Sequence, residues 1–157
     1  MIDRMKKPFV SITSLFLLGS LFGQPEQPEI RTLDSKFAKE TQCLNPEYLL
    51  FSASKTGKDK PALLIYLHGG GGVGNDVRRL QGQAKALLEG IDRFEKGPCH
   101  VVVPQCSRIR KDGGRGTWES EDLNLLLEGL ESSLGFDSKR IYLTGNSMGG
   151  YGSWTWG

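Results

Sequence analysis

The sequence predicts an α/β fold in which a doubly wound, mostly parallel sheet carries helices on both faces. Two observations support this prediction. Short runs of consecutive apolar residues, such as "ALLIYL" and "HVVVP", have the length of strands and lack the alternation of a half-exposed sheet. Segments with apolar residues at helical spacing lie between these runs. Strands that alternate with amphipathic helices are typical of parallel sheets covered on both faces.

The predicted elements begin near residue 47 and alternate along the chain. The polar turn "KTGKDKP" separates the first two strands. Asp76 is expected to cap the first helix, and Gly135 to follow the end of the second. The predicted strands cover residues 47–54, 62–67, 100–104 and 140–145, and the predicted helices cover 77–91 and 123–134.

The N-terminal residues have the composition of an export signal. A positively charged start precedes the apolar stretch "FVSITSLFLLGSLFG", which is shorter than the roughly 20 residues that a membrane-spanning helix needs. A buried N-terminal helix is the alternative. We expect a signal peptide over 1–23, a polar linker or N-terminal extension over 24–45 and one domain over 46–157. The protein is then secreted or periplasmic, with no stable membrane anchor after cleavage.

Charge and cysteine content exclude some functions and leave others open. A formal net charge of +2 over 157 residues does not indicate a nucleic-acid partner. No cluster of metal-ligand residues is visible, so we predict no cofactor. Cys99 and Cys106 flank a predicted strand and stand roughly 23 Å apart at about 3.3 Å per residue, too far to form a disulfide. Cys43 could pair with either, or with a cysteine that is not in this chain, and buried free thiols are equally compatible with the sequence.

The segment "GNSMG" presents a serine directly after the last predicted strand. Gly145 and Gly149 flank Ser147 in a G-x-S-x-G pattern, with an apolar strand before it and a helix-compatible segment after it. A sharp strand-to-helix turn of this kind exposes a nucleophilic serine, and glycines let neighbouring backbone pass close by. An ordinary glycine-rich turn is the alternative, but the strand and helix around the pattern favour a nucleophile.

The glycine-rich segment "LHGGGGVGND" has two interpretations. Gly69, Gly71 and Gly74 fit the spacing of a dinucleotide-binding loop, which needs an acidic residue at the end of the next strand. That strand ends in "PQC", with no acid. The other interpretation is an oxyanion loop, whose backbone N–H groups face the charge that develops on a carbonyl oxygen. The presence of both this loop and Ser147 favours the oxyanion loop.

Several segments together resemble the α/β-hydrolase superfamily. The strings "LLIYLHGGGGVGND", "VVVPQC", "GTWES" and "SKRIYLTGNSMGGYGSW" are most similar to bacterial secreted esterases and predicted peptidases related to phospholipases and carboxylesterases. The resemblance covers most of residues 47–157 and is most specific around Ser147. It implies an α/β-hydrolase fold and a serine hydrolase that cleaves a small-molecule carboxylic ester through an acyl-enzyme.

The resemblance also implies a role for each site residue. Ser147 would be the nucleophile, and the N–H of Met148 one oxyanion donor. Gly70 or Gly71 would supply the second donor. His68 would then be a structural member of the loop and not the catalytic base.

The sequence departs from this family in one large respect. The triad of this fold runs in the order Ser, then Asp or Glu, then His, but the two histidines here, His68 and His100, both precede Ser147. His100 begins a predicted strand, far from the strand ends that bind ligands, so we interpret it as a packing or surface residue. We therefore expect an N-terminal portion of a longer hydrolase, truncated after the serine turn and inactive alone. A serine peptidase of the same fold and a catalytically inactive domain are the alternatives.

Other candidates are weaker. The basic residues of "SRIRKDGGRGTW" could meet an acidic group on a substrate, although a solvated loop is the favoured interpretation. Trp118 could line a pocket or pack in the core. Trp154 and Trp156 are expected to pack against the sheet. The four basic residues of the segment "SRIRKDGGRGTW" are Arg108, Arg110, Lys111 and Arg115.

Overall fold

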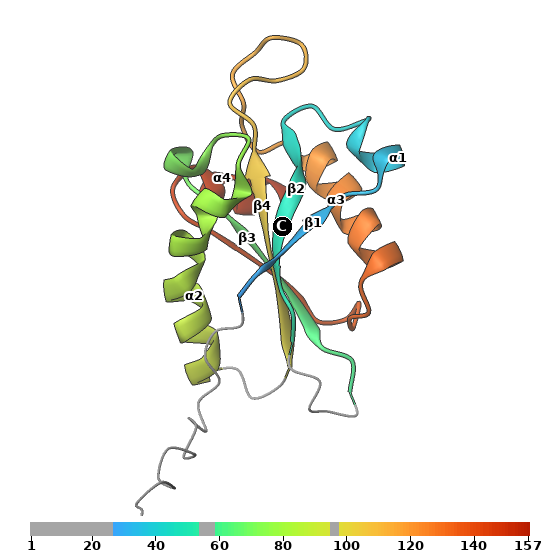
Figure 1. Ribbon diagram of the computed structural model, residues 1–157, viewed down its shortest axis with the longest axis vertical. Coiled ribbons are helices and arrows are strands. Elements are labelled where there is room, and N and C mark those ends of the chain that lie inside the picture. Colours follow the sequence, from blue (N-terminus) through green and yellow to red (C-terminus); the bar gives the residue numbers. More distant parts are fainter. Residues whose placement is uncertain (1–26, 54–58, 95–97) are drawn as a thin grey trace, which may run out of the picture.

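The computed structural model describes residues 27–53, 59–94 and 98–157, which form one five-stranded sheet in the order β1-β2-β4-β3-β5 (Figure 1). Strand β2 pairs antiparallel with β1 and with β4, whereas β3 pairs parallel with β4 and β5, so β2 alone runs against the others. The strands are β1 (Glu29–Thr32), β2 (Leu44–Phe51), β3 (Ala62–Leu67), β4 (Cys99–Cys106) and β5 (Ile141–Gly145). The helices are α1 (Ser35–Ala38), α2 (Gln81–Phe94), α3 (Ser120–Ser133) and α4 (Met148–Trp156), with short 3₁₀ turns η1 (Gly70–Gly72) and η2 (Val77–Leu80).

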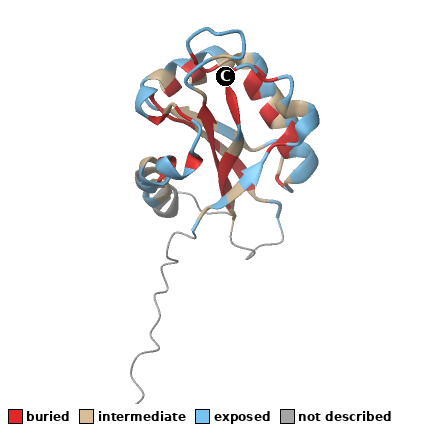
Figure 2. Ribbon diagram, turned by 45° about the horizontal axis from the view of Figure 1, so that its top comes forward, coloured by how far each residue is buried: buried red, intermediate tan, exposed pale blue. Residues whose placement is uncertain are grey.

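Helices cover both faces of the sheet. Turn η2 and helix α2 pack on one face, where Leu49, Val101 and Val103 point, while α3 and α4 pack on the other face against Leu63 and Val102. Colouring by burial shows the buried residues concentrated along the strands and the inner sides of the helices (Figure 2). Among the described residues, every buried side-chain nitrogen and oxygen has a hydrogen-bond partner. The prediction of a doubly wound, mostly parallel sheet is confirmed.

The strand order defines where the functional loops meet. The connection from β3 runs through α2 to β4, on one side of β3, and the connection from β4 runs through α3 to β5, on the other side. Turn η2 and helix α2 follow β3 on one face, and helix α4 follows β5 on the other face. The loops that leave the carboxyl ends of β3 and β5 therefore turn to opposite faces of the sheet. Ligands of open α/β sheets bind at such a point. Leu67 and Gly145, the last residues of these two strands, are register partners.

The predicted elements are present with small shifts at their ends. Strand β2 begins at Leu44, three residues before the predicted start, and β4 extends over all of Cys99–Cys106. Asp76 does cap a helical segment, since its carboxylate accepts a hydrogen bond from the Arg78 N–H at 3.1 Å. That segment starts as the 3₁₀ turn η2 and continues as α2. Leu134 caps the second helix, α3, directly before Gly135.

The segment predicted as a linker or N-terminal extension contributes two elements that the sequence did not predict, β1 and α1. The sequence of β1, "EIRT", is mostly exposed at the edge of the sheet, so it lacks the apolar run that identifies a buried strand. The predicted signal peptide lies outside the described residues, and the division into domains stays a prediction. Within the described residues, none of the helices has the length and apolar character needed to cross a membrane.

Candidate active site

Ser147 lies at the sharp turn between β5 and α4. Its backbone dihedrals are φ 52° and ψ −114°, and it is the one non-glycine residue with a positive φ in the described part of the chain. A residue with a Cβ is strained in this region, and such strain persists only where the surrounding structure imposes it. The Ser147 side chain makes no capping hydrogen bond to α4, and the residue is exposed. The hydroxyl is therefore accessible from solvent.

The glycines on either side of Ser147 are required by close backbone contacts. A Cβ on Gly145 would lie 2.2 Å from the carbonyl oxygen of Gly149, and a Cβ on Gly149 would lie 1.9 Å from that of Leu67. The Asn146 N–H also donates to the Leu67 oxygen at 3.1 Å. The turn is thus packed directly against the end of β3, which leaves no room for side chains at either glycine.

The glycine loop, residues 69–76 after β3, begins beside Ser147. A Cβ built on Gly69 would lie 3.4 Å from the Ser147 Cβ and 3.1 Å from the Asn146 oxygen. Gly70 and Gly71 follow in η1, are exposed, and would have no atom within 4 Å of an added Cβ. Met148 is the first residue of α4. The fold thus brings Ser147, Met148 and the start of the glycine loop to the same end of the sheet.

His68 is a fully buried residue that joins β3 to β4. Its Nδ1–H donates to the Gly69 oxygen at 2.7 Å, and its Nε2 accepts from the Cys106 N–H at 2.9 Å. This pattern requires the neutral imidazole with the proton on Nδ1. Burial also lowers the pKa of His68 below its ordinary value. Because both ring nitrogens are engaged with the backbone, His68 has no free nitrogen to deprotonate a serine.

Trp118 connects His68 to the helix that follows Ser147. The indole ring packs on the His68 ring with 4.8 Å between centroids, and its Nε1–H donates to the His68 carbonyl oxygen at 3.0 Å. A Cβ on Gly152 of α4 would lie 2.7 Å from the Trp118 Cβ. Trp118 is 7% exposed. It is therefore a core residue that fixes α4 against the start of the glycine loop.

His100 lies at the opposite end of the sheet. It pairs in register with Leu63, four residues before Leu67, which corresponds to about 13 Å along β3. Its Nδ1 accepts from the Ala53 N–H at 3.0 Å, and burial lowers its pKa. The prediction that His100 is a packing residue, remote from Ser147, agrees with this position.

Gln105 is a site residue whose role the sequence did not indicate. It stands in β4 close to where a dinucleotide-binding loop would need its acidic residue, but its neutral amide is fully buried and bonded to the glycine loop. The sequence showed "VVVPQC" as the end of a strand and carried no signal for the direction of this side chain.

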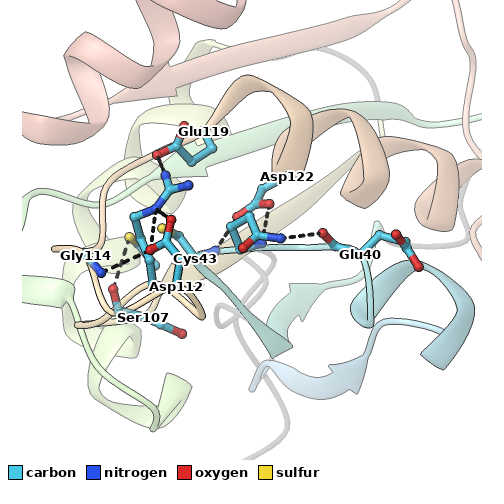
Figure 3. Close-up of polar contacts among 10 residues, drawn as sticks. Glu40, Cys43, Ser107, Asp112, Gly114, Glu119 and Asp122 are labelled. Atoms are coloured by element: carbon cyan, nitrogen blue, oxygen red, sulfur yellow. Dashed lines mark hydrogen bonds and ion pairs between the residues drawn. The ribbon is translucent and has the colours of Figure 1, made fainter.

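The basic loop between β4 and α3 projects beyond the sheet (Figure 1). Arg110 forms ion pairs with Asp112, at 3.1 Å, and with Glu119 (Figure 3). Lys111 Nζ donates to two backbone carbonyl oxygens of the α1 segment, at 2.8 and 3.0 Å. Two of the four basic residues are thus engaged within the protein. This agrees with a surface loop better than with a binding site for an acidic substrate.

The C-terminal tryptophans differ in their environment. Trp156 packs against the core and donates from Nε1 to the Asn124 side chain at 2.8 Å, as predicted for a packing residue. Trp154 is 89% exposed, so the prediction that it packs against the sheet is wrong. It lies on the outer side of α4, which the sheet does not reach.

The buried cysteines have no sign of reactivity. Cys43 and Cys106 are free thiols in the core, and burial raises the pKa of Cys106 to about 12.

Asp122 accepts from the N–H groups of Gln42 and Cys43, at 2.7 and 2.6 Å, and so fixes the start of β2 on α3 (Figure 3). Within the described residues, no group of three or more His, Cys, Asp or Glu side chains could hold a metal ion.

One solved structure described as a thermostable esterase is similar to this chain, with a TM-score of 0.60 and 26% sequence identity. The match covers 83% of this chain and 37% of that chain, so this chain spans little more than a third of the esterase's length. The fold is of the α/β-hydrolase type. A second structure, Thermogutta terrifontis esterase 2 phosphorylated by paraoxon, is 11% identical with a TM-score of 0.49 over 83% of this chain and 47% of that one, too distant to carry an argument. No family model and no curated protein matches the sequence.

Proposed function

We propose that this chain is the nucleophile-bearing portion of a serine hydrolase that cleaves carboxylic esters. The single observation that carries the proposal is the backbone of Ser147, which is held at φ 52° between a strand and a helix with its hydroxyl exposed. Strain at an exposed nucleophilic side chain is a recurrent feature of catalytic sites. The fold similarity to an esterase supports the same reaction class.

The proposed chemistry is acyl transfer through Ser147. The Ser147 Oγ attacks the acyl carbon while its proton passes to a base, and the resulting oxyanion accepts hydrogen bonds from backbone N–H groups. We assign these donors to Met148 and to Gly70 or Gly71. The alcohol then leaves with a proton, and water releases the acid from the acyl-enzyme. The residues assigned here need no metal or cofactor for these steps.

The base and the acid of the proposed reaction come from polypeptide outside the 157 residues, because both follow the nucleophile in this fold and no Asp, Glu or His follows Ser147 in the sequence. His68 and His100 are the two histidines of the sequence, and each has its ring bonded to the backbone. His100 is also at the wrong end of the sheet. Ser147 therefore has oxyanion donors but no base within this chain, so the chain alone is an inactive or nearly inactive enzyme. The predicted signal peptide supports export as part of this proposal.

A fluorophosphonate probe tests the nucleophile. Because oxyanion donors alone retain residual reactivity, labelling of the full chain is followed over hours and mapped by peptide mass spectrometry. Label is expected at Ser147 in preference to the other serines and absent from Ser147→Ala. Ser153→Ala is the matched control, because its hydroxyl bonds only the Gly149 oxygen at 2.8 Å within α4. Labelling spread over many serines would reject Ser147 as the nucleophile and favour the inactive-domain alternative.

A further inference from the structure

The Gln105 side chain is a buried connector between β4 and the glycine loop. Its Nε2 donates to the carbonyl oxygens of Gly72, at 3.0 Å, and Asp76, at 3.1 Å. Its Oε1 accepts from Asn45 Nδ2 at 2.9 Å, and Gln105 is 0% exposed. Both amide protons are thus used on the glycine loop, and the oxygen is used on β2.

The direction of the Gln105 amide is fixed by Asn45. The Oδ1 of Asn45 accepts from the backbone N–H of Glu47 at 3.1 Å, which turns its NH₂ group toward Gln105. An NH₂ group can only donate, so the Gln105 oxygen must face Asn45 and the Gln105 nitrogen must face the glycine loop. The hydrogen bonds therefore run in one direction, from β2 through β4 to the loop.

The two carbonyl groups that Gln105 binds bracket most of the glycine loop. Gly72 is the last residue of η1, and Asp76 caps η2. Between them, the Gly74 N–H donates to the Cys106 oxygen at 3.0 Å, and a Cβ on Gly74 would lie 3.4 Å from the Gln105 Nε2. The loop is therefore tied to the end of β4 on both sides of Gly74, and η1 carries Gly70 and Gly71 as a consequence.

We propose that Gln105, oriented by Asn45, is a positioning residue that holds η1 so that its backbone N–H groups face the acyl oxygen at Ser147. This inference rests on the proposed ester-hydrolase function. Gln105 touches no substrate and acts through the loop. A neutral amide suits the role, because a glutamate of the same size would offer no N–H donor and would direct a carboxylate at two carbonyl oxygens.

The experiment compares three variants of the full chain with the wild type. Gln105→Met keeps the length of the side chain and removes all three hydrogen bonds. Asn45→Ala removes the bond that orients Gln105, together with the bond that Asn45 accepts from the Glu47 N–H, and leaves the Gln105 amide in place. It keeps the proposal testable if Gln105→Met does not fold. His100→Leu is the matched control, because His100 is also a buried β4 residue bonded to a neighbouring backbone N–H, at the far end of the strand. All are measured by amide hydrogen exchange and by Ser147 labelling with a fluorophosphonate.

Hydrogen exchange should respond at the loop and not across the molecule. In Gln105→Met, the amides of Gly72, Val73 and Gly74 should exchange about 10-fold faster or more relative to those of β3, because two carbonyl oxygens of the loop, at Gly72 and Asp76, lose their donor. Asn45→Ala should give a smaller change at the same amides, and the double variant no more than Gln105→Met alone. His100→Leu should change exchange near its own end of the sheet and leave the loop unaffected.

Labelling separates positioning from mere stability. The labelling rate at Ser147 should fall about 10-fold or more in Gln105→Met and stay unchanged in His100→Leu, since complete loss of an oxyanion donor costs about 100-fold or more in rate. Unchanged loop exchange in Gln105→Met, or unchanged labelling with a loosened loop, would overturn the inference while leaving the proposed function standing. Absence of Ser147 labelling in the wild type would reject the proposed function and, with it, the catalytic part of this inference.

Discussion

At the scale of single residues, the turn around Ser147 explains why its two glycines are fixed and why others nearby are not. The sequence pattern predicted the requirement for Gly145 and Gly149, but only the structure identifies the opposing atoms, which are backbone oxygens that cannot rotate away. Gly150 has the same helix around it and an ordinary contact, with a Cβ 3.6 Å from the Gly145 oxygen. These neighbours therefore form a matched pair.

Alanine at Gly149 and alanine at Gly150 should change the free energy of unfolding in opposite directions. Gly149→Ala forces the backbone of β3 or α4 to move and should lower the free energy of unfolding by about 1–3 kcal/mol or more. Gly150→Ala should raise it by up to about 1 kcal/mol, because alanine favours the helix. Urea denaturation of both variants measures the difference. Equal destabilisation by the two substitutions would contradict the packing described for the turn.

Proline at Gly70 distinguishes between the two candidate oxyanion donors in the loop. Gly70 is the first residue of η1 and Gly69 before it is extended, at φ −76° and ψ 178°, so a proline is compatible with the backbone. Gly70→Pro should keep the fold and, if Gly70 is the donor, slow Ser147 labelling by about 100-fold, because proline has no N–H. Gly70→Ala is the control that retains the N–H. A normal rate in Gly70→Pro would assign the donor to Gly71.

At the scale of elements, the carboxyl end of β4 is joined to the end of β3 and to the glycine loop by side chains that the sequence could not orient. Apolar runs and helical spacing predicted the central strands and both long helices, because burial on two faces leaves a clear pattern. β1 and α1 were not predicted, since neither buries a continuous apolar segment. The roles of His68 and Gln105 depend on contacts with residues more than 25 positions away, which no local pattern reveals.

The two histidines that join elements should make stability depend on pH. Burial lowers the pKa values of His68 and His100 below 6.5. Both rings therefore stay neutral in the folded protein at pH values where the same histidines take up protons in the unfolded chain. Stability should therefore fall as pH drops below about 6.5, by up to about 1.4 kcal/mol per pH unit for each histidine. Urea denaturation between pH 7 and 5 measures the slope, and His100→Gln should reduce it. A constant free energy of unfolding over this range would contradict buried neutral histidines.

At the scale of the whole molecule, β5 and α4 form an incompletely covered side. Strand β5 pairs only with β3 among the described strands, and its residues are less buried than those of β3 and β4. Tyr142 on β5 is 48% exposed, and Tyr151 and Trp154 on α4 are 78% and 89% exposed. An unpaired strand edge beside exposed aromatic residues favours association. The aromatic character of Trp154 in the sequence suggested packing, because a sequence alone does not show which side of a helix remains uncovered.

Two tryptophan substitutions test this view of α4. Trp154→Lys should reduce aggregation, measured by light scattering, with little change in Tm, because the side chain has few contacts to lose. Trp156→Lys should lower Tm, because Trp156 packs on the core and bonds Asn124. A loss of stability in Trp154→Lys as large as in Trp156→Lys would show that the exposed side of α4 is misassigned.

We propose that this chain supplies the nucleophile, Ser147, and its oxyanion donors without a base. The most direct test is the rate of fluorophosphonate labelling at Ser147 as a function of added imidazole, which can replace a missing general base. We predict slow labelling of the full chain without imidazole, a rate that rises with imidazole concentration, and no label in Ser147→Ala under either condition. Labelling that is fast without imidazole and insensitive to it would contradict the account, because a base would then lie within these 157 residues.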